Sequence, residues 1–328
     1  MPEPLLTLEH VTRTFTVKGQ TIKAVDDINL TIPEGEMLCL VGESGCGKTT
    51  TGKMIAGILT TSSGRILYRG KDIATIAGND RKAYRLGVQM VHQDPYASLN
   101  PTQTVYDILA APLQHHHFTR GESETKRSIC QLLEIVDLTP PDDFLEKYPH
   151  QLSGGQRQRV SVARALTVRP AFIVADEAVS MVDVSIRISL LNMFARLKEE
   201  MGVGVLLITH DLALAKYFAW EGRIGVMYLG RLMEIGPARE VVEHPQHPYT
   251  QVLLSAIPEA DPDATRLKQR IELRSTDMPS LLRLPTGCTF HPRCPAFIGE
   301  VCERIVPPLE KAQWGSEVAC HLVEAHES

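Results

Sequence analysis

Long apolar runs and an excess of basic residues are both missing from this sequence. No stretch of about eighteen consecutive apolar residues occurs, so the chain lacks the pattern of a membrane-spanning helix. Its 34 Lys and Arg residues are outnumbered by 39 Asp and Glu residues, and the basic ones are scattered along the chain. Because a nucleic-acid surface needs a concentrated basic stripe, this distribution argues against DNA or RNA as a partner.

A secretory leader and disulfides are not expected either. The first ten residues, MPEPLLTLEH, carry acidic residues where a signal peptide has basic ones before an apolar stretch. We therefore expect a cytoplasmic protein, in whose reducing surroundings the seven cysteines stay unpaired. Aromatic residues make up only 5%, but a hydrophobic share of 43% over 328 residues suffices for one large domain and a smaller appendage.

The spacing of apolar residues predicts an α/β fold. Apolar and polar residues alternate over residues 6–32, as in an antiparallel pair of strands. Short apolar runs at 37–41, 172–175 and 205–208 are separated by helical patterns, which is typical of buried parallel strands.

Two other regions depart from this pattern. Helical segments at 105–113 and 125–138 predict an inserted helical lobe, and the proline-rich end of the chain predicts a loop-rich tail. We place the core in 1–90 and 166–240, the helical lobe in 91–165 and the tail in 241–328.

A phosphate loop, GESGCGKTT, occupies residues 42–50. It fills the pattern G-x-x-x-x-G-K-[ST] between an expected strand and an expected helix. In such a loop, backbone N–H groups converge on phosphate oxygens, Lys48 reaches the β- and γ-phosphates, and the Thr49 hydroxyl ligates Mg²⁺. The sequence therefore predicts ATP and Mg²⁺ as ligands, with nucleotide contacts from Gly42, Ser44, Gly45, Cys46, Gly47, Lys48, Thr49 and Thr50.

Polar residues also follow three other apolar runs. We expect Asp176 to hold the Mg²⁺ through water, and Glu177 to orient or deprotonate the attacking water. His210 follows the next strand, where ligands of open α/β sheets gather, and Gln93 would contact the metal or the water. The alternative for Asp176 and Glu177 is that they merely end a strand, and the alternative for His210 is a structural histidine.

A second glycine-rich turn, LSGGQ, occupies residues 152–156. Ser153 is placed to cap a helix, and the two glycines after it allow close approach, which predicts a second anion site. One nucleotide does not need two helix N-termini from distant parts of one chain. We therefore expect this turn to contact an ATP held by another subunit.

Together these motifs resemble the ATP-binding subunits of ABC transporters over residues 1 to about 240. The resemblance implies an ABC-type phosphate-loop ATPase with a RecA-like core, an antiparallel β layer and an inserted helical subdomain. It also implies ATP hydrolysis, and a sandwich of two ATP molecules between this chain and a second ATPase subunit, either a related chain or a second copy.

The resemblance gives individual residues their roles. Phe15 would stack on adenine, Gln93 would link the nucleotide to membrane subunits, and Asp183 would lie in the segment that crosses the dimer. The catalytic group would comprise Lys48, Gln93, Glu177 and His210, and the partner's γ-phosphate would be contacted by Ser153, Gly154, Gly155 and Gln156. One segment departs from the family pattern: Ala178, Met181 and Val182 stand where the family has Pro, Ala and Leu.

The tail resembles the C-terminal extension of the oligopeptide and dipeptide importer branch, on the stretches HPQHPYTQVLLSAIP and GCTFHPRCP. That branch implies two transmembrane permease subunits, an extracytoplasmic solute-binding protein and a peripheral place on the cytoplasmic face of the inner membrane. Peptides are the default cargo, while oligosaccharides and nickel stay open. The rival functions are a soluble ABC ATPase that remodels DNA or ribosomes, and a catalytically silent subunit.

Four cysteines of the tail, Cys288, Cys294, Cys302 and Cys320, are separated by five, seven and seventeen residues, without a C-x-x-C pair. Spacing alone allows either Zn²⁺ or an iron–sulfur cluster. A resemblance to importer subunits that carry such clusters favours [4Fe-4S], and free buried thiols are the alternative.

Overall fold

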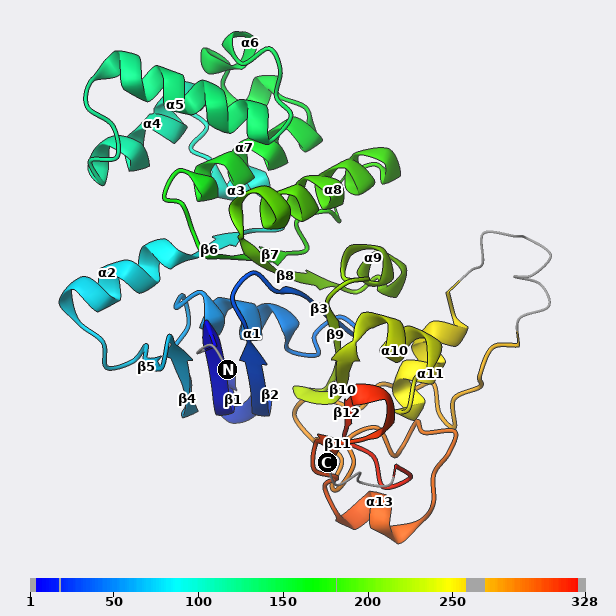
Figure 1. Ribbon diagram of the computed structural model, residues 1–328. Coiled ribbons are helices and arrows are strands. Elements are labelled where there is room, and N and C mark those ends of the chain that lie inside the picture. Colours follow the sequence, from blue (N-terminus) through cyan, green and yellow to red (C-terminus); the bar gives the residue numbers. More distant parts are fainter. Residues whose placement is uncertain (1–3, 18, 181, 258–268, 324–328) are drawn as a thin grey trace.

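The computed structural model describes residues 4–17, 19–180, 182–257 and 269–323. The described residues form two sheets, a helical lobe and a tail (Figure 1). The strands are β1 (Leu6–Val17), β2 (Gln20–Ile32), β3 (Met37–Val41), β4 (Ser63–Tyr68), β5 (Lys71–Asp72), β6 (Val88–Val91), β7 (Phe172–Asp176), β8 (Gly204–Thr209), β9 (Arg223–Tyr228), β10 (Arg231–Pro237), β11 (Glu310–Lys311) and β12 (Glu317–Val318). The helices are α1 (Lys48–Ile55), α2 (Gly78–Gly87), α3 (Pro95–Ser98), α4 (Val105–His115), α5 (Glu122–Ile135), α6 (Asp142–Leu145), α7 (Gly154–Leu166), α8 (Val184–Met201), α9 (Leu212–Phe218), α10 (Ala238–Glu243), α11 (Pro248–Ser255) and α13 (Glu300–Arg304), with 3-10 turns at Pro149–Gln151 and Gln313–Gly315.

The smaller sheet is antiparallel, with strand order β2-β1-β4-β5. Strand β1 pairs with β2 from Leu6 opposite Ile32 to Val17 opposite Gln20. The antiparallel pair predicted from the alternation over residues 6–32 is therefore confirmed.

The larger sheet has the order β11-β12-β10-β9-β3-β8-β7-β6. Its five strands from β9 to β6 run parallel, and β10 pairs antiparallel with β9. The three predicted parallel strands are confirmed as the adjacent strands β3, β8 and β7. Because parallel strands end at the same edge, the segments that follow β3, β6, β7 and β8 meet there.

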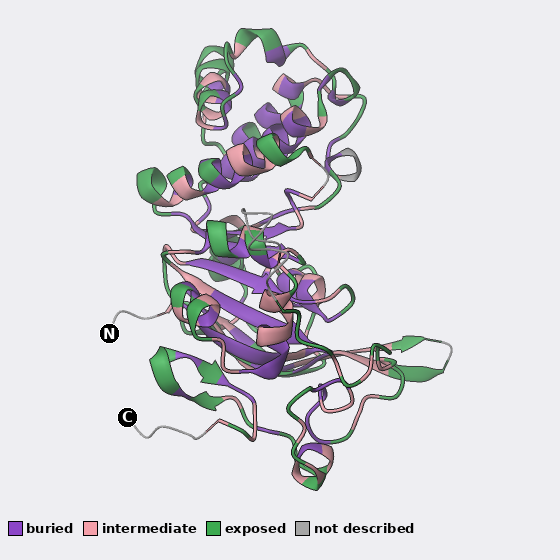
Figure 2. Ribbon diagram, turned by 90° about the vertical axis from the view of Figure 1, so that its right-hand side faces the viewer, coloured by how far each residue is buried: buried purple, intermediate pink, exposed green. Residues whose placement is uncertain are grey.

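Both faces of the parallel strands are buried, and each strand divides its side chains between two cores. In β3, Cys39 belongs to the core on the side of α9, which continues into the helical lobe, whereas Leu38 and Leu40 pack toward the antiparallel sheet and α1. In β7, Ile173 belongs to the same core as Cys39, and Val174 belongs to the same core as Leu38 and Leu40. Figure 2 shows the central strands as the most continuously buried part of the molecule. This explains why the sequence shows unbroken apolar runs there.

The helical lobe, α3 to α7, lies between β6 and β7 in the chain (Figure 1). The helix predicted over 125–138 begins earlier and ends earlier, at Glu122 and Ile135. It ends early because Asp137 takes a left-handed φ of 56° and two prolines follow soon after. Within the described residues, no helix combines the length and apolar character needed to span a bilayer.

The tail is loop-rich, as predicted, but it is not a separate appendage. Strand β12 pairs with β10, Glu234 lying opposite Val318, so the tail extends the large sheet. This pairing was not predicted, because a two-residue strand carries no periodic signal.

Candidate active site

The phosphate loop connects the end of β3 to the start of α1. Gly42, Gly45 and Gly47 have φ values of 153°, 79° and 106°, which residues with a Cβ rarely adopt. A Cβ on Gly47 would lie 2.3 Å from the carbonyl oxygen of Ala24. Gly47 is also the N-cap of α1 and supplies no side-chain cap. The N–H groups at the start of α1 therefore lack a side-chain cap, which is the arrangement that an anion site at a helix N-terminus requires.

Lys48 folds back over this loop. Its side chain is buried, and Nζ donates to the carbonyl oxygens of Gly42 at 2.7 Å and Glu43 at 3.0 Å. The next residue, Thr49, donates from Oγ1 to Asp176 Oδ1 at 2.8 Å. Burial raises the pKa of Asp176, although the hydrogen bond from Thr49 opposes this shift. The adjacent hydroxyl and carboxylate oxygens are the kind of ligand that Mg²⁺ prefers, so these residues fit the ion.

Glu177 lies between side chains from two other strand ends. Its Oε2 accepts from Gln93 Nε2 at 2.9 Å, and its Oε1 lies 3.3 Å from His210 Nδ1. Glu177 has a φ of 46°, a strained conformation that costs about 1–3 kcal/mol for a residue with a Cβ. Its N–H bonds to the carbonyl oxygen of Ile208 at 3.0 Å, and its carbonyl oxygen accepts from Ser180 Oγ at 2.8 Å. These bonds hold the carboxylate toward Gln93 and His210.

The LSGGQ turn begins α7, in the helical lobe rather than beside the phosphate loop of the same chain (Figure 1). Ser153 Oγ accepts from the Gln156 N–H at 3.2 Å, and Gln156 Oε1 accepts from the Ser153 N–H at 2.9 Å. This capping box explains the spacing of Ser153 and Gln156. A Cβ on Gly155 would lie 2.6 Å from Ile186 Cγ2, so close packing of α8 favours glycine there.

Two other residues predicted to contact nucleotide or partner, Phe15 and Asp183, lie on other elements of the fold. Phe15 is half-buried on β1, opposite Ile22. Asp183 is exposed at the N-cap of α8. Met181, one of the three departures from the family pattern, lies outside the described residues.

Comparison with known proteins identifies the family. Residues 25–180 match the ABC transporter family, and residues 233–302 match the C-terminal region of oligopeptide/dipeptide transporters. The putative oligopeptide transport ATP-binding protein YkfD of Bacillus subtilis is 42% identical over 320 residues, which cover 97% of this chain and 95% of that protein. The oligopeptide transport ATP-binding protein AppF of the same organism is 40% identical over 329 residues, which cover 98% of each chain.

The chain belongs to the ABC transporter family. The resemblance inferred from the motifs is thereby confirmed.

Solved structures agree with this assignment. The cbiO1 protein of Clostridium perfringens, part of the ABC transporter complex cbiONQ, matches with a TM-score of 0.64 and 25% identity. The match covers 74% of this chain and 92% of cbiO1. A dimeric bacterial ABC transporter cassette matches with a TM-score of 0.62 and 27% identity, over 71% of this chain and 99% of the cassette. The predicted ABC ATPase fold is confirmed.

The tail cysteines of this ABC ATPase do not support the predicted metal centre. The backbone N–H of Cys288 bonds to the carbonyl oxygen of Cys302 at 2.9 Å. Burial, with smaller effects from neighbouring thiols, raises the pKa of both Cys288 and Cys294 to about 11. Across the described residues, however, no group of three or more His, Cys, Asp or Glu side chains is placed to hold a metal ion. Neither the iron–sulfur cluster nor zinc has geometric support.

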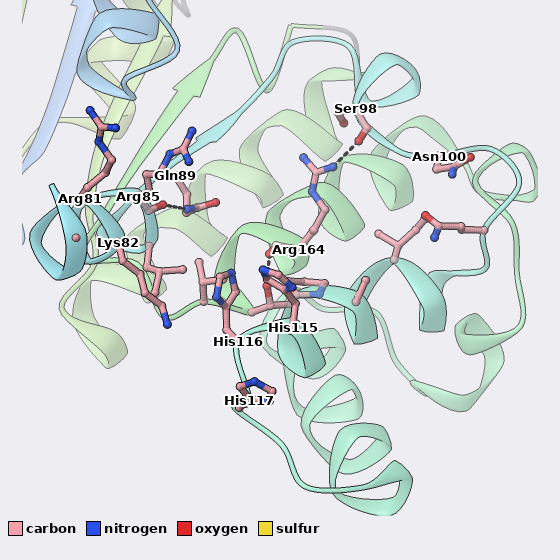
Figure 3. Close-up of a pocket in the computed structure, with 18 residues that line it drawn as sticks. Arg81, Lys82, Arg85, Gln89, Ser98, Asn100, His115, His116, His117 and Arg164 are labelled. Atoms are coloured by element: carbon pink, nitrogen blue, oxygen red, sulfur yellow. Dashed lines mark hydrogen bonds between the residues drawn. The ribbon is translucent and has the colours of Figure 1, made fainter. Parts of the chain in front are cut away.

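A basic groove was missed by the sequence reasoning. It is a cavity of about 920 Å³ between α2, β6, α4 and α7 (Figure 3). No Asp or Glu is among its lining residues, whereas seven of them are basic or imidazole groups: Arg81, Lys82, Arg85, His115, His116, His117 and Arg164. The run of three histidines was a signal for it, but only the fold brings α2 opposite α4.

A link between the tail and the phosphate loop was also missed. Arg293 of the tail forms an ion pair with Glu43 of the loop. Nothing in the sequence identifies which carboxylate a distant arginine will meet.

The glycines of the phosphate loop allow a matched test. We expect Gly47→Ala to lower the free energy of unfolding by about 3 kcal/mol, from backbone strain plus overlap with Ala24, and to abolish nucleotide binding. Gly45→Ala is the control: Gly45 shares the positive φ but has no atom near its Cβ position, so about 1 kcal/mol is expected. Chemical denaturation of both variants measures the difference, and equal losses would contradict this account.

Proposed function

We propose that this chain binds Mg-ATP at the phosphate loop and hydrolyses it to energise peptide import through membrane partners. The observation that carries the proposal is the convergence of two side-chain groups at one sheet edge. One is the pair Thr49 and Asp176, and the other joins Gln93 and His210 to Glu177.

In this proposal each group has a distinct task. The loop glycines and Lys48 bind the phosphates, while Thr49 directly, Asp176 through water and Gln93 hold Mg²⁺. Bound Mg²⁺ would neutralise charge on the transferred phosphoryl group. Glu177 orients the attacking water or takes its proton, and His210 holds the Glu177 carboxylate in position.

The proposal includes a second ATPase subunit, either a related chain or a second copy. Ser153, Gly154, Gly155 and Gln156 begin a helix away from the phosphate loop of their own chain, which supports a role at a partner's γ-phosphate. Asp183 would lie at the same dimer interface, and Phe15 would stack on adenine. The division into a core at 1–90 and 166–240, a lobe at 91–165 and a tail at 241–328 belongs to this proposal.

Peptides are the proposed cargo. The relatives named above are oligopeptide transport proteins, and the tail matches the oligopeptide/dipeptide transporter region. Oligosaccharides and nickel have no comparable support. Two permease subunits and an extracytoplasmic binding protein would complete the importer, with this chain at the cytoplasmic face of the inner membrane.

The basic groove supports a docking site for the permease. Arg81, Lys82 and Arg85 lie on one wall, and the His115–His117 run lies on another (Figure 3). A surface with this charge attracts an acidic segment. The groove also adjoins β6, which leads directly to Gln93, so an occupant would lie near the residue that contacts Glu177.

Hydrolysis and cargo are tested together in vesicles that hold the assembled transporter. We expect Glu177→Gln to lower the rate of ATP hydrolysis at least about a hundredfold while ATP still binds, because only the base is lost. Peptide uptake should fall in parallel, and parent vesicles should take up peptides rather than oligosaccharides. Full hydrolysis by Glu177→Gln would contradict the proposed base, and uptake of oligosaccharides alone would contradict the cargo.

The docking groove is tested by charge reversal. We expect the double variant Arg81→Glu/Arg85→Glu to lose co-purification with the permease, since its charge would repel an acidic segment. Arg127→Glu, on the exposed face of α5 outside the groove, is the matched control and should co-purify normally. If both variants associate like the parent, the permease docks elsewhere.

An iron–sulfur cluster at Cys288, Cys294, Cys302 and Cys320 stays a prediction, with zinc as the alternative. The prediction rests on the four cysteines sharing one loop-rich segment of the sequence, although their side chains are not assembled as ligands. Protein purified without oxygen should show broad absorbance in the blue, lost in Cys294→Ser and kept in Cys130→Ser. Colourless protein with stoichiometric zinc would reject the cluster.

A further inference from the structure

Glu43, the second residue of the phosphate loop, is held by the tail. Arg293 Nη1 donates to Glu43 Oε2 at 2.7 Å, and Arg293 Nη2 donates to Glu43 Oε1 at 3.0 Å. The Glu43 N–H donates to Tyr249 Oη at 3.1 Å, in α11. Both the side chain and the backbone of this loop residue therefore depend on parts of the chain more than two hundred residues away.

Contacts with the tail and the core hold Arg293 in place, in addition to its ion pair with Glu43. Arg293 is only 6% exposed, and Nη1 also donates to Tyr228 Oη at 3.2 Å. Its backbone N–H bonds to the carbonyl oxygen of Phe290 at 3.0 Å, in a tight turn of the tail. The Phe290 ring packs against Tyr228 and Tyr249, with centroid separations of 5.3 and 5.1 Å. A buried, two-pronged ion pair on such a support allows little freedom of position.

The charge of Glu43 gives this contact a consequence for nucleotide binding. A phosphate loop receives a polyanion, yet this loop carries a carboxylate of its own. Arg293 neutralises that carboxylate and turns it away from solvent, Glu43 being partly buried. Without the arginine, an unpaired negative charge would remain in the loop and would repel the phosphates.

The backbone on both sides of Glu43 has little room to relax. A Cβ on Gly42 would lie 2.1 Å from the carbonyl oxygen of Met227, so β9 lies directly against the loop. On the other side, Lys48 Nζ bonds to the Glu43 carbonyl oxygen at 3.0 Å. A shift of Glu43 would therefore move the lysine that is proposed to contact the phosphates.

We propose that Arg293 is a positioning residue for ATP: the tail sets the geometry and the charge of the phosphate loop through the Arg293–Glu43 ion pair. This inference rests on the nucleotide site proposed above. Arg293 acts through Glu43 and does not itself touch the nucleotide.

The test measures affinity for a fluorescent ATP analogue with Mg²⁺ in the full-length chain, alongside thermal unfolding. We expect Arg293→Ala to weaken binding on the order of tenfold. Arg293→Lys should have a smaller effect, because lysine keeps the positive charge but cannot donate two parallel hydrogen bonds to the Glu43 carboxylate. Glu43→Gln combined with Arg293→Ala should bind more tightly than Arg293→Ala alone, because the unpaired carboxylate is gone. A merely structural role for Arg293 predicts no such rescue.

Two further variants make the result decisive. Arg304→Ala is the matched control: Arg304 also lies in the tail, but its ion pair with Glu300 is exposed, so binding should not change. Lys48→Ala tests the nucleotide site itself and should abolish binding. If Lys48→Ala fails to bind while Arg293→Ala and Arg293→Lys bind like the parent, the positioning role is wrong and the site stands. If Lys48→Ala binds the ATP analogue normally, the proposed nucleotide site is itself wrong. Should Arg293→Ala not fold, Arg293→Lys and Glu43→Gln carry the test, with weakened binding by Arg293→Lys expected.

Discussion

The parallel pairing of β3, β8, β7 and β6 is the constraint on which the site depends. Its register places Val41 opposite Thr209, Asp176 opposite Ile208 and Val91 opposite Ala175, so all four strands end at one edge. The segments that follow supply the phosphate loop, the acidic pair, the histidine and the glutamine. A slip of one residue would turn every side chain of a strand to the other face and would separate these groups.

The two cores keep that register fixed. Each parallel strand contributes apolar side chains to both cores, one that includes the helical lobe, α8 and α9 and one that includes the antiparallel sheet, so neither face tolerates a slip. This rigid support is what allows strained backbone at the edge. The left-handed Glu177 and the crowded glycines of the phosphate loop cost free energy locally, and burial of the strands offsets it.

The tail belongs to this support rather than to the periphery. Strand β12 extends the large sheet, the rings of Tyr228, Tyr249 and Phe290 join tail to core, and Arg293 reaches the phosphate loop. A segment that looks like a loop-rich addition in sequence therefore contributes to the most exacting part of the site. The helical lobe behaves differently, since its LSGGQ turn satisfies its own helix and lies away from the phosphate loop of the same chain.

By itself, the sequence determined which residues end buried strands and which glycines begin helices. The spacing of apolar residues and the G-x-x-x-x-G-K-T pattern are both properties of short stretches of chain. The phosphate loop, the Asp176–Glu177 pair and the antiparallel pair of strands were all predictable on that basis. Only the tertiary structure decided that Gln93 and His210 reach the same carboxylate, 84 and 33 residues from it, and that Arg293 meets Glu43 across 250 residues. Those contacts depend on the order of strands in the sheet and on where the tail joins it, and local patterns of apolar and polar residues do not encode either.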